Sequence, residues 1–237
     1  SLGAYAIARA FVRDGAGFVA TLQLLVFTSM VAGLIALPDM LLGEYATHNL
    51  LRATIGGEAM PPVEYRLGLA RATSVFDHPI HLGTYCASLV AMIWSVERRQ
   101  GARIRYAVIA SLATLTALSS APLLCIGVQI MLLLWERATR GVAKRVPIFV
   151  AILLGLYLGA SVVATRSPIA LIATGMTLDS WTGFYRLMIW EYGLDTVWKH
   201  PLLGIGLADW ERPKWMVAST IDAFWLVTAM RSGVPAF

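Results

Sequence analysis

The sequence predicts an all-α protein, a polytopic bundle of transmembrane helices with one large external loop. Three observations support this prediction. Only 14% of the 237 residues are charged, whereas soluble domains carry about a quarter. The mean hydropathy is +0.68, and several uncharged apolar runs approach or exceed the roughly 20 residues that a helix needs to cross a bilayer. These runs are residues 17–37, 80–96, 106–135 and 146–165.

Clusters of basic residues between the apolar runs set the orientation. The net charge of +5 comes largely from these short stretches, so it indicates membrane orientation rather than a groove that binds nucleic acid. Two clusters are expected to be cytoplasmic. The first is Arg98, Arg99, Arg103 and Arg105, and the second is Arg137, Arg140, Lys144 and Arg145.

Alternation between the two sides then assigns the first elements. Run 17–37 crosses outward, 38–78 is an external segment with few apolar residues in register, and 79–96 crosses back. Because residues 106–135 lie between two cytoplasmic clusters, they must cross an even number of times. As one helix they would measure about 45 Å, at a rise of 1.5 Å per residue. We therefore predict two helices that turn at 119–122, where Pro122 suits the first turn of the second helix.

The later elements follow the same rule. Run 146–165 crosses outward, 166–220 forms the large external loop, and a last helix re-enters from Ile221, which gives about six spans. The predicted organisation is an N-terminal span plus external segment (1–78), helices with two basic cytoplasmic loops (79–165), the loop (166–220) and the start of a further span (221–237). No signal peptide is visible. The chain lacks an initial methionine and ends in an apolar stretch, so we expect it to be truncated at both ends.

The external loop contains an amphipathic helix. In the stretch FYRLMIWEYGLDTVW, one helical face is formed by Tyr185, Ile189, Tyr192 and Thr196. The following HPLLGIG, residues 200–206, breaks the helix with a proline and two glycines. Five tryptophans lie in the loop, and such enrichment favours a position at the level of the lipid headgroups. A purely structural interfacial helix remains an alternative.

A polar cluster precedes the helix at 79–96, in the stretch RATSVFDHPIHLGTY. With Pro79 as the first helical residue, Asp77 or His78 caps the helix, and His78 and His81 share a face. A helix N-terminus attracts anions, and the planar guanidinium of Arg71 suits phosphate. The cluster predicts an external phosphate site, and a cap with headgroup-anchoring side chains is the structural alternative.

Such a site needs a second source of positive charge. The external loop offers Arg186 on its amphipathic helix, with Arg166 and Lys199 nearby in sequence.

Asp222 lies at the external end of the last apolar run. An ionisable residue inside a span is by default a functional hypothesis. Asp222 is a candidate general base if a dry site raises its pKa, or an N-cap of the helix. Arg231, nine residues on, points to roughly the opposite face, and its role is open. The sequence has no phosphate-binding glycine loop and no Cys/His metal spacing, so we expect a site without metal or cofactor.

Four stretches resemble the O-antigen ligase and O-antigen polymerase family, and together they cover roughly residues 66–237. They are Arg-x-x-Ser-x-Phe-x-His-Pro-Ile-x-Leu-Gly at 71–83, LSSAPLL at 118–124, Tyr-Arg-x-x-x-Trp with HPLLGIG at 185–206, and VASTIDAFWLVTAMRSG at 217–233.

The resemblance implies a multi-pass glycosyltransferase of the bacterial inner membrane whose active face is periplasmic. The family moves a glycan from undecaprenyl diphosphate to an acceptor hydroxyl, on lipid A-core in ligases and on another lipid-linked repeat in polymerases. It uses neither a nucleotide sugar nor a metal. The implied partners are these glycans, membrane lipids and other membrane proteins of polysaccharide assembly, and no nucleic acid.

The resemblance also implies roles for individual residues. Arginines at the external face are the family's main functional residues, and Arg71 and Arg186 occupy matching motif positions. We predict that they converge to hold the diphosphate. The predicted catalytic residues are Arg71, Arg186 and Asp222, and the predicted substrate-binding residues are His78, His81, Tyr185, Arg166, Trp190 and His200.

Two departures from the family pattern bear on the prediction. Ligases typically carry a histidine where this chain has Asp222, which favours a polymerase or a related exopolysaccharide enzyme. Many relatives have Ser-Arg-Gly where this chain has Ser120, Ala121 and Pro122, so no arginine is carried over there. A transporter or flippase of lipid-linked or anionic substrates, and a non-catalytic membrane subunit that docks a partner, are the alternatives.

Overall fold

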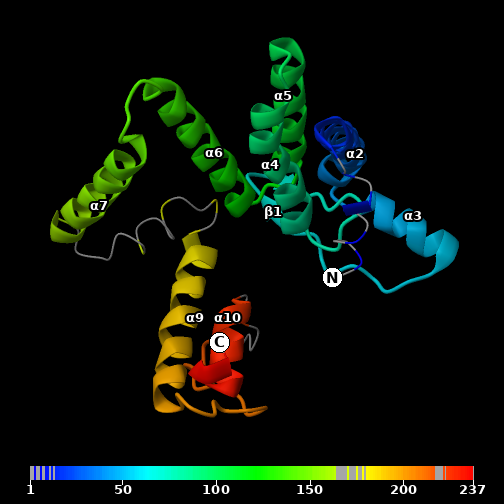
Figure 1. The fold of residues 1–237 in the computed structure, drawn as a ribbon. Coiled ribbons are helices and arrows are strands. Elements are labelled where there is room, and N and C mark those ends of the chain that lie inside the picture. The colour runs from blue at the N-terminus through cyan, green and yellow to red at the C-terminus, as the bar shows by residue number, and fades with distance from the viewer. Residues whose placement is uncertain are drawn as a thin grey trace. The chain divides into compact units, whose positions relative to one another are not determined.

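The computed structural model describes residues 14–163, 180–216 and 223–236, with the isolated positions 3, 6, 9, 10, 12, 170, 175, 178 and 221. These residues contain eight α-helices, one short 3-10 helix and one two-stranded sheet (Figure 1). The chain divides into two compact units, Ser1–Ile148 and Phe149–Phe237. The predicted all-α class is confirmed.

Helix α2 (Gly15–Leu42) is longer than the sequence predicts. The carboxylate of Asp14 caps it by accepting the N–H of Gly17 at 2.6 Å. The predicted end at residue 37 is wrong, because the helix continues through Pro38 to Leu42 and ends at Gly43 with a φ of 73°. Membrane helices tolerate proline where neighbouring groups satisfy the freed backbone.

The segment after α2, which is predicted to be external, has regular structure of its own. It contains helix α3 (Ala46–Ile55) and the antiparallel strands β1 (Tyr65–Arg66) and β2 (Leu69–Ala70). The turn residues Leu67 and Gly68 have φ values of 54° and 76°. Positive φ at both central residues is typical of a two-residue type I′ hairpin turn.

Three further helices complete the first unit, namely α4 (Pro79–Val96), α5 (Gln100–Thr116) and α6 (Ser120–Ala138). The predicted start at Pro79 is confirmed, and so is the reversal in the 106–135 run, where residues 117–119 separate α5 from α6. Pro122 is the third residue of α6, in its first turn.

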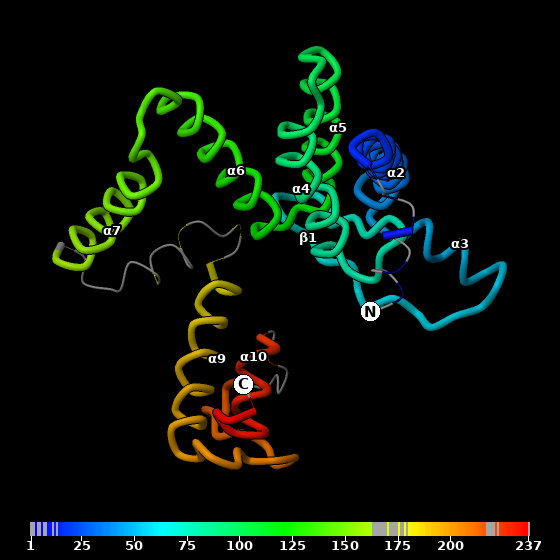
Figure 2. Tube along the Cα trace, viewed as in Figure 1, coloured from blue at the N-terminus to red at the C-terminus, as the bar shows by residue number. Residues whose placement is uncertain are grey.

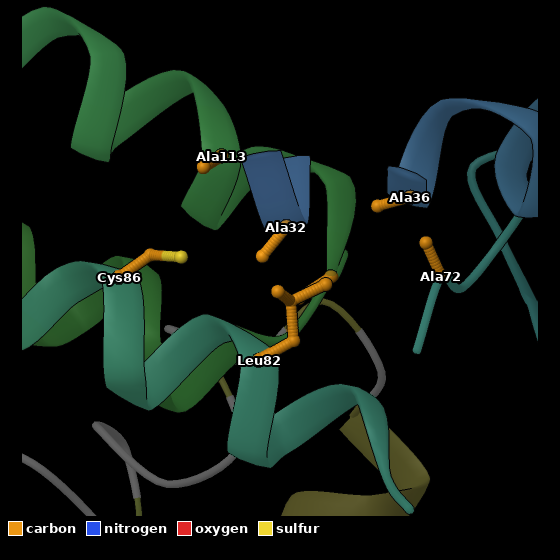
Figure 3. Packing of buried hydrophobic residues seen from close by; sticks show 7 residues of the cluster. Ala32, Ala36, Ala72, Leu82, Cys86 and Ala113 are labelled. Atoms are coloured by element: carbon orange, nitrogen blue, oxygen red, sulfur yellow. The ribbon is translucent and has the colours of Figure 1, made fainter. Parts of the chain in front are cut away.

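Helices α2, α4 and α5 pack on one another, while α6 packs against α4. One cluster of this core consists mainly of small residues, and Figure 3 shows part of it; its members are Ala32, Ala36, Ala72, Leu82, Cys86, Ala113 and Ala117. A Cβ on Gly33 would lie 2.8 Å from the Cβ of Ala113, and one on Gly83 would lie 2.7 Å from Pro122. Close approach at small residues is the usual packing of membrane helices.

Helix α7 (Arg145–Val163) leads into the second unit, which also contains α9 (Ser180–Lys199), α10 (Phe224–Ser232) and the 3-10 helix η1 (Val234–Ala236). Helices α9 and α10 lie side by side, as the trace in Figure 2 shows. A Cβ on Gly193 of α9 would lie 2.7 Å from Leu226 of α10, so the two helices approach closely there.

Four of the described helices are long and apolar enough to cross a membrane: α2, α4, α6 and residues Arg145–Val162 of α7. Helix α5 has 17 residues and contains Arg103 and Arg105, and α10 has nine residues, about 14 Å at the helical rise. The crossings predicted for these two segments remain predictions.

Candidate functional site

Arg71 lies in a buried polar cluster at the end of α2, next to the hairpin. Its side chain is almost fully buried, and its residue is 2% exposed. Its Nη1 donates to Oε2 of Glu64, and its backbone N–H donates to the carbonyl of Glu64 at 2.9 Å. Among the described residues, its Nε and Nη2 have no hydrogen-bond partner. The guanidinium thus keeps donors that only a further group can satisfy.

Tyr45 lies within electrostatic reach of this ion pair. Burial raises the pKa of its phenol, the carboxylate of Glu64 raises it further, and the charge of Arg71 opposes both effects. The phenol is therefore neutral at pH 7. Glu64 itself has a side chain that is 60% exposed, so Glu64 lies between Arg71 and the solvent.

The hairpin is fastened to the turn between α5 and α6, which contains part of the LSSAPLL stretch. Arg66 Nη1 donates to the carbonyl of Leu118 at 3.4 Å, and Ala72 N–H donates to the carbonyl of Thr116 at 3.2 Å. An apolar groove of about 520 Å³ runs between α2 and α5 up to this turn. Its lining includes Met30, Leu34, Leu37, Leu112, Leu115 and Leu118.

His78 is the residue that caps α4. Its Nδ1 accepts the N–H of Ile80 at 3.1 Å, and its carbonyl accepts the N–H of His81 at 3.0 Å. Two donors at this helix end are therefore engaged by the cap. His81 is exposed one turn on, with its ring centroid 6.0 Å from that of His78. Tyr85 points to α2, where its hydroxyl donates to the carbonyl of Leu25 at 3.2 Å.

In the second unit, Tyr185 and Arg186 lie half-buried on α9. The ring of Tyr185 meets that of Trp215 edge-on at 6.2 Å between centroids, and Trp181 and Phe184 complete the cluster at 5.7 Å from each other. Trp181, Phe184 and Trp215 are all exposed. The predicted face of α9 agrees in part with the observed burial. Ile189 and Thr196 are buried, whereas Tyr185 and Tyr192 are half-buried.

The HPLLGIG segment binds the C-terminal end of α10. The N–H groups of Ile205 and Gly206 donate to the carbonyls of Met230 and Arg231 at 2.8 and 2.9 Å, which satisfies helix-end acceptors that have no partner within the helix. His200 and Trp190 are both exposed. The motif therefore has a structural role, which is to attach α10 to the end of α9.

Ion pairs neutralise the basic residues beside this segment. Lys199 pairs with Glu211 at 2.5 Å and with Asp195 at 2.9 Å, and these contacts raise its pKa to about 12. Arg212 Nη1 donates to Asp209 at 2.6 Å and lowers the pKa of that carboxyl. Lys199 is therefore already engaged by two carboxylates. Asp209 and Arg231 line a neighbouring hollow of about 560 Å³.

Two predicted site residues, Arg166 and Asp222, lie outside the described residues. Arg71 belongs to the first unit and Arg186 to the second, so their convergence remains a prediction.

Sequence reasoning missed three residues near the 71–74 segment: the buried Asp39 and Tyr45 and the exposed Glu64. Asp39 carried a usable signal, because an ionisable residue next to apolar run 17–37 is a functional hypothesis. Glu64 and Tyr45 had no such signal, since the hairpin and α3 bring them to Arg71.

A family model described as O-antigen ligase matches residues 105–237, which is more than half of the chain. No curated protein and no solved structure matches the chain.

Proposed function

Because the chain belongs to the O-antigen ligase family, we propose that it is a polymerase-like glycosyltransferase of the bacterial inner membrane. Glycan transfer of the O-antigen ligase or polymerase type follows from the family. The finer proposal is that the donor is a glycan on undecaprenyl diphosphate, that the acceptor is another lipid-linked repeat, and that the site faces the periplasm. Asp222 in place of the ligase histidine supports the polymerase.

The observation that carries the proposal is the buried guanidinium of Arg71. A buried cation needs strong compensation, yet its only ion-pair partner among the described residues is the half-exposed Glu64, and Nε and Nη2 have no partner there. Phosphate oxygens are suited to these planar donors. Access of a diphosphate to Arg71 requires that Glu64 moves aside.

The reaction then follows from charge. The acceptor hydroxyl attacks the anomeric carbon, and the new C–O bond forms as the bond from that carbon to the diphosphate oxygen breaks. The electron pair leaves with the diphosphate, and the hydroxyl proton goes to Asp222. Arg71 and Arg186 stabilise the charge that develops on the phosphate oxygens. The apolar groove beside the hairpin supports the binding of a polyprenyl chain.

Incubation of the full-length purified protein with undecaprenyl-diphosphate-linked repeats, with and without lipid A-core, tests the proposal. A ladder on a gel without core is expected, and transfer to core alone would instead identify a ligase. Arg71→Ala and Arg186→Ala should each lower the rate about 10²–10³-fold, the effect of losing one oxyanion donor. Arg99→Ala is a matched control, because Arg99 is an exposed arginine outside the proposed site. Full activity of both site variants would contradict the proposal that Arg71 and Arg186 hold the diphosphate.

A further inference from the structure

Asp39 is a fully buried carboxylate in the last turn of α2. Its Oδ2 accepts the N–H groups of Ser74 and Thr73 at 2.9 and 3.2 Å, and the hydroxyl of Thr73 at 3.4 Å. Its Oδ1 has no partner among the described residues, and neither has the Ser74 hydroxyl. One carboxylate oxygen therefore holds two consecutive backbone N–H groups of the segment that follows Arg71.

These contacts maintain an unusual backbone conformation. Ser74 has a φ of 55°, and a non-glycine residue persists in this sparsely populated region only where its surroundings enforce it. The bonds from Asp39 to residues 73 and 74 supply that enforcement. A bond from Phe76 N–H to the carbonyl of Thr73 at 3.0 Å closes the turn.

The anchored segment begins at Arg71. The backbone N–H of Arg71 is bound to Glu64 on one side, Ala72 is bound to Thr116, and the next two residues are bound to Asp39. Residues 71–74 are thereby fixed to α2, to the end of α5 and to the segment before the hairpin. Because the side chain of Arg71 extends from this backbone, its direction depends on all three attachments.

We propose that Asp39 is a positioning residue, which fixes residues 71–74 so that Arg71 is directed at the phosphate groups of the donor. This inference rests on the proposed function. It assigns no contact between Asp39 and substrate, and it predicts that Asp39 acts on donor binding and on leaving-group stabilisation together.

The first test examines the segment without any activity measurement. In a Cys125→Ser background, a nitroxide is attached to Val75→Cys, because Val75 is 53% exposed while the remaining Cys86 is buried. In the electron paramagnetic resonance spectrum, Asp39→Ala should give the narrow lines of a mobile nitroxide. The spectrum of Asp39→Asn should stay close to that of the parent. Ser29→Ala is the control, since Ser29 is equally buried in α2 and its hydroxyl donates to the carbonyl of Val26 within the same helix. An unchanged spectrum for Asp39→Ala would overturn the proposal.

The second test measures transfer by the full-length protein. Asp39→Ala should raise the donor KM and lower kcat, each by about tenfold, with the acceptor KM unchanged, and Asp39→Asn should recover most of the donor KM. A fall in rate at an unchanged donor KM would indicate loss of folded enzyme and would overturn the proposal. If the wild-type protein transfers no glycan, the proposed function fails, and the spin-label result still decides whether Asp39 fixes the segment.

Discussion

The ion pair between Arg71 and Glu64 joins a buried cation to a mostly solvent-exposed anion. Such a pair differs from a surface salt bridge, because the arginine has lost its hydration while the glutamate has kept most of its own. In the proposed function, a diphosphate with two or more charges competes with this single carboxylate for the guanidinium of Arg71. We therefore propose that Glu64 is a resident anion that the donor displaces.

Glu64→Gln should increase the affinity of the site for its donor. The amide keeps the shape of the side chain but removes the competing charge, so we expect the donor KM to fall roughly threefold to tenfold, the scale of one partly exposed charged hydrogen bond. Steady-state kinetics with lipid-linked repeats measures this change. Glu44→Gln is the control, because Glu44 is an exposed acid just after α2. A higher KM in Glu64→Gln would mean that Glu64 orients Arg71.

Helix boundaries were predictable where local chemistry decides them. Pro79 and His78 begin α4 as predicted, and a basic cluster on either side of residues 106–135 required the reversal between α5 and α6. Tertiary contacts decided the boundary that was missed. Pro38 interrupts the backbone bonds of α2, yet Asp39 next to it is bound to residues 73 and 74, and a single-sequence pattern cannot anticipate that partner.

One polar side chain joins α6 to α4 through two hydrogen bonds. Gln129 Oε1 accepts the N–H of Ala91 at 2.7 Å, and its Nε2 donates to the carbonyl of Ala87 at 3.1 Å. Gln129→Leu should lower the free energy of unfolding by about 0.6–1.7 kcal/mol, the measured range for bonds between membrane helices. Thermal unfolding in detergent tests this, with the exposed Met131→Leu on the same helix as the control. Equal melting of the two variants would contradict it.

The attachment of the HPLLGIG segment to α10 permits a second comparison. Gly204 and Gly206 both have positive φ, at 65° and 64°. A Cβ on Gly204 would lie 2.4 Å from the backbone of Arg231, whereas one on Gly206 would meet nothing within 4 Å. Alanine at either position incurs the same strain of about 1–2 kcal/mol.

Gly204→Ala should therefore be the more destabilising change, by about 1–3 kcal/mol, which is the usual range for forcing atoms into a filled space. The difference is measured from the thermal unfolding of the two purified variants. Gly206→Ala is the control, because it has the same backbone strain but no steric clash. If the two variants unfold alike, the segment does not bind α10 as described.

At the scale of the whole molecule, the proposed site needs residues from both units to reach one side of the membrane. Orientation was derived from the two basic clusters, and the four apolar helices are consistent with several crossings. Helix periodicity and loop charge do not predict the convergence of Arg71 and Arg186. It depends on the tertiary position of the predicted loop 166–220, and we expected it only from the family resemblance. Sidedness is the property that tests it most directly.

Single cysteines in a Cys125→Ser background report the side of each segment. We expect Asp77→Cys, next to the cap of α4, and Leu203→Cys, in the HPLLGIG segment, to react with a membrane-impermeant maleimide in intact spheroplasts, because both residues are exposed. Val142→Cys, between α6 and α7 beside the second basic cluster, should react only after permeabilisation. Labelling of 77 and 203 from opposite sides would place the start of α4 and the HPLLGIG segment on opposite faces of a bilayer with about 30 Å of hydrocarbon. The proposed periplasmic site requires both segments on the periplasmic side, so this outcome would contradict that arrangement.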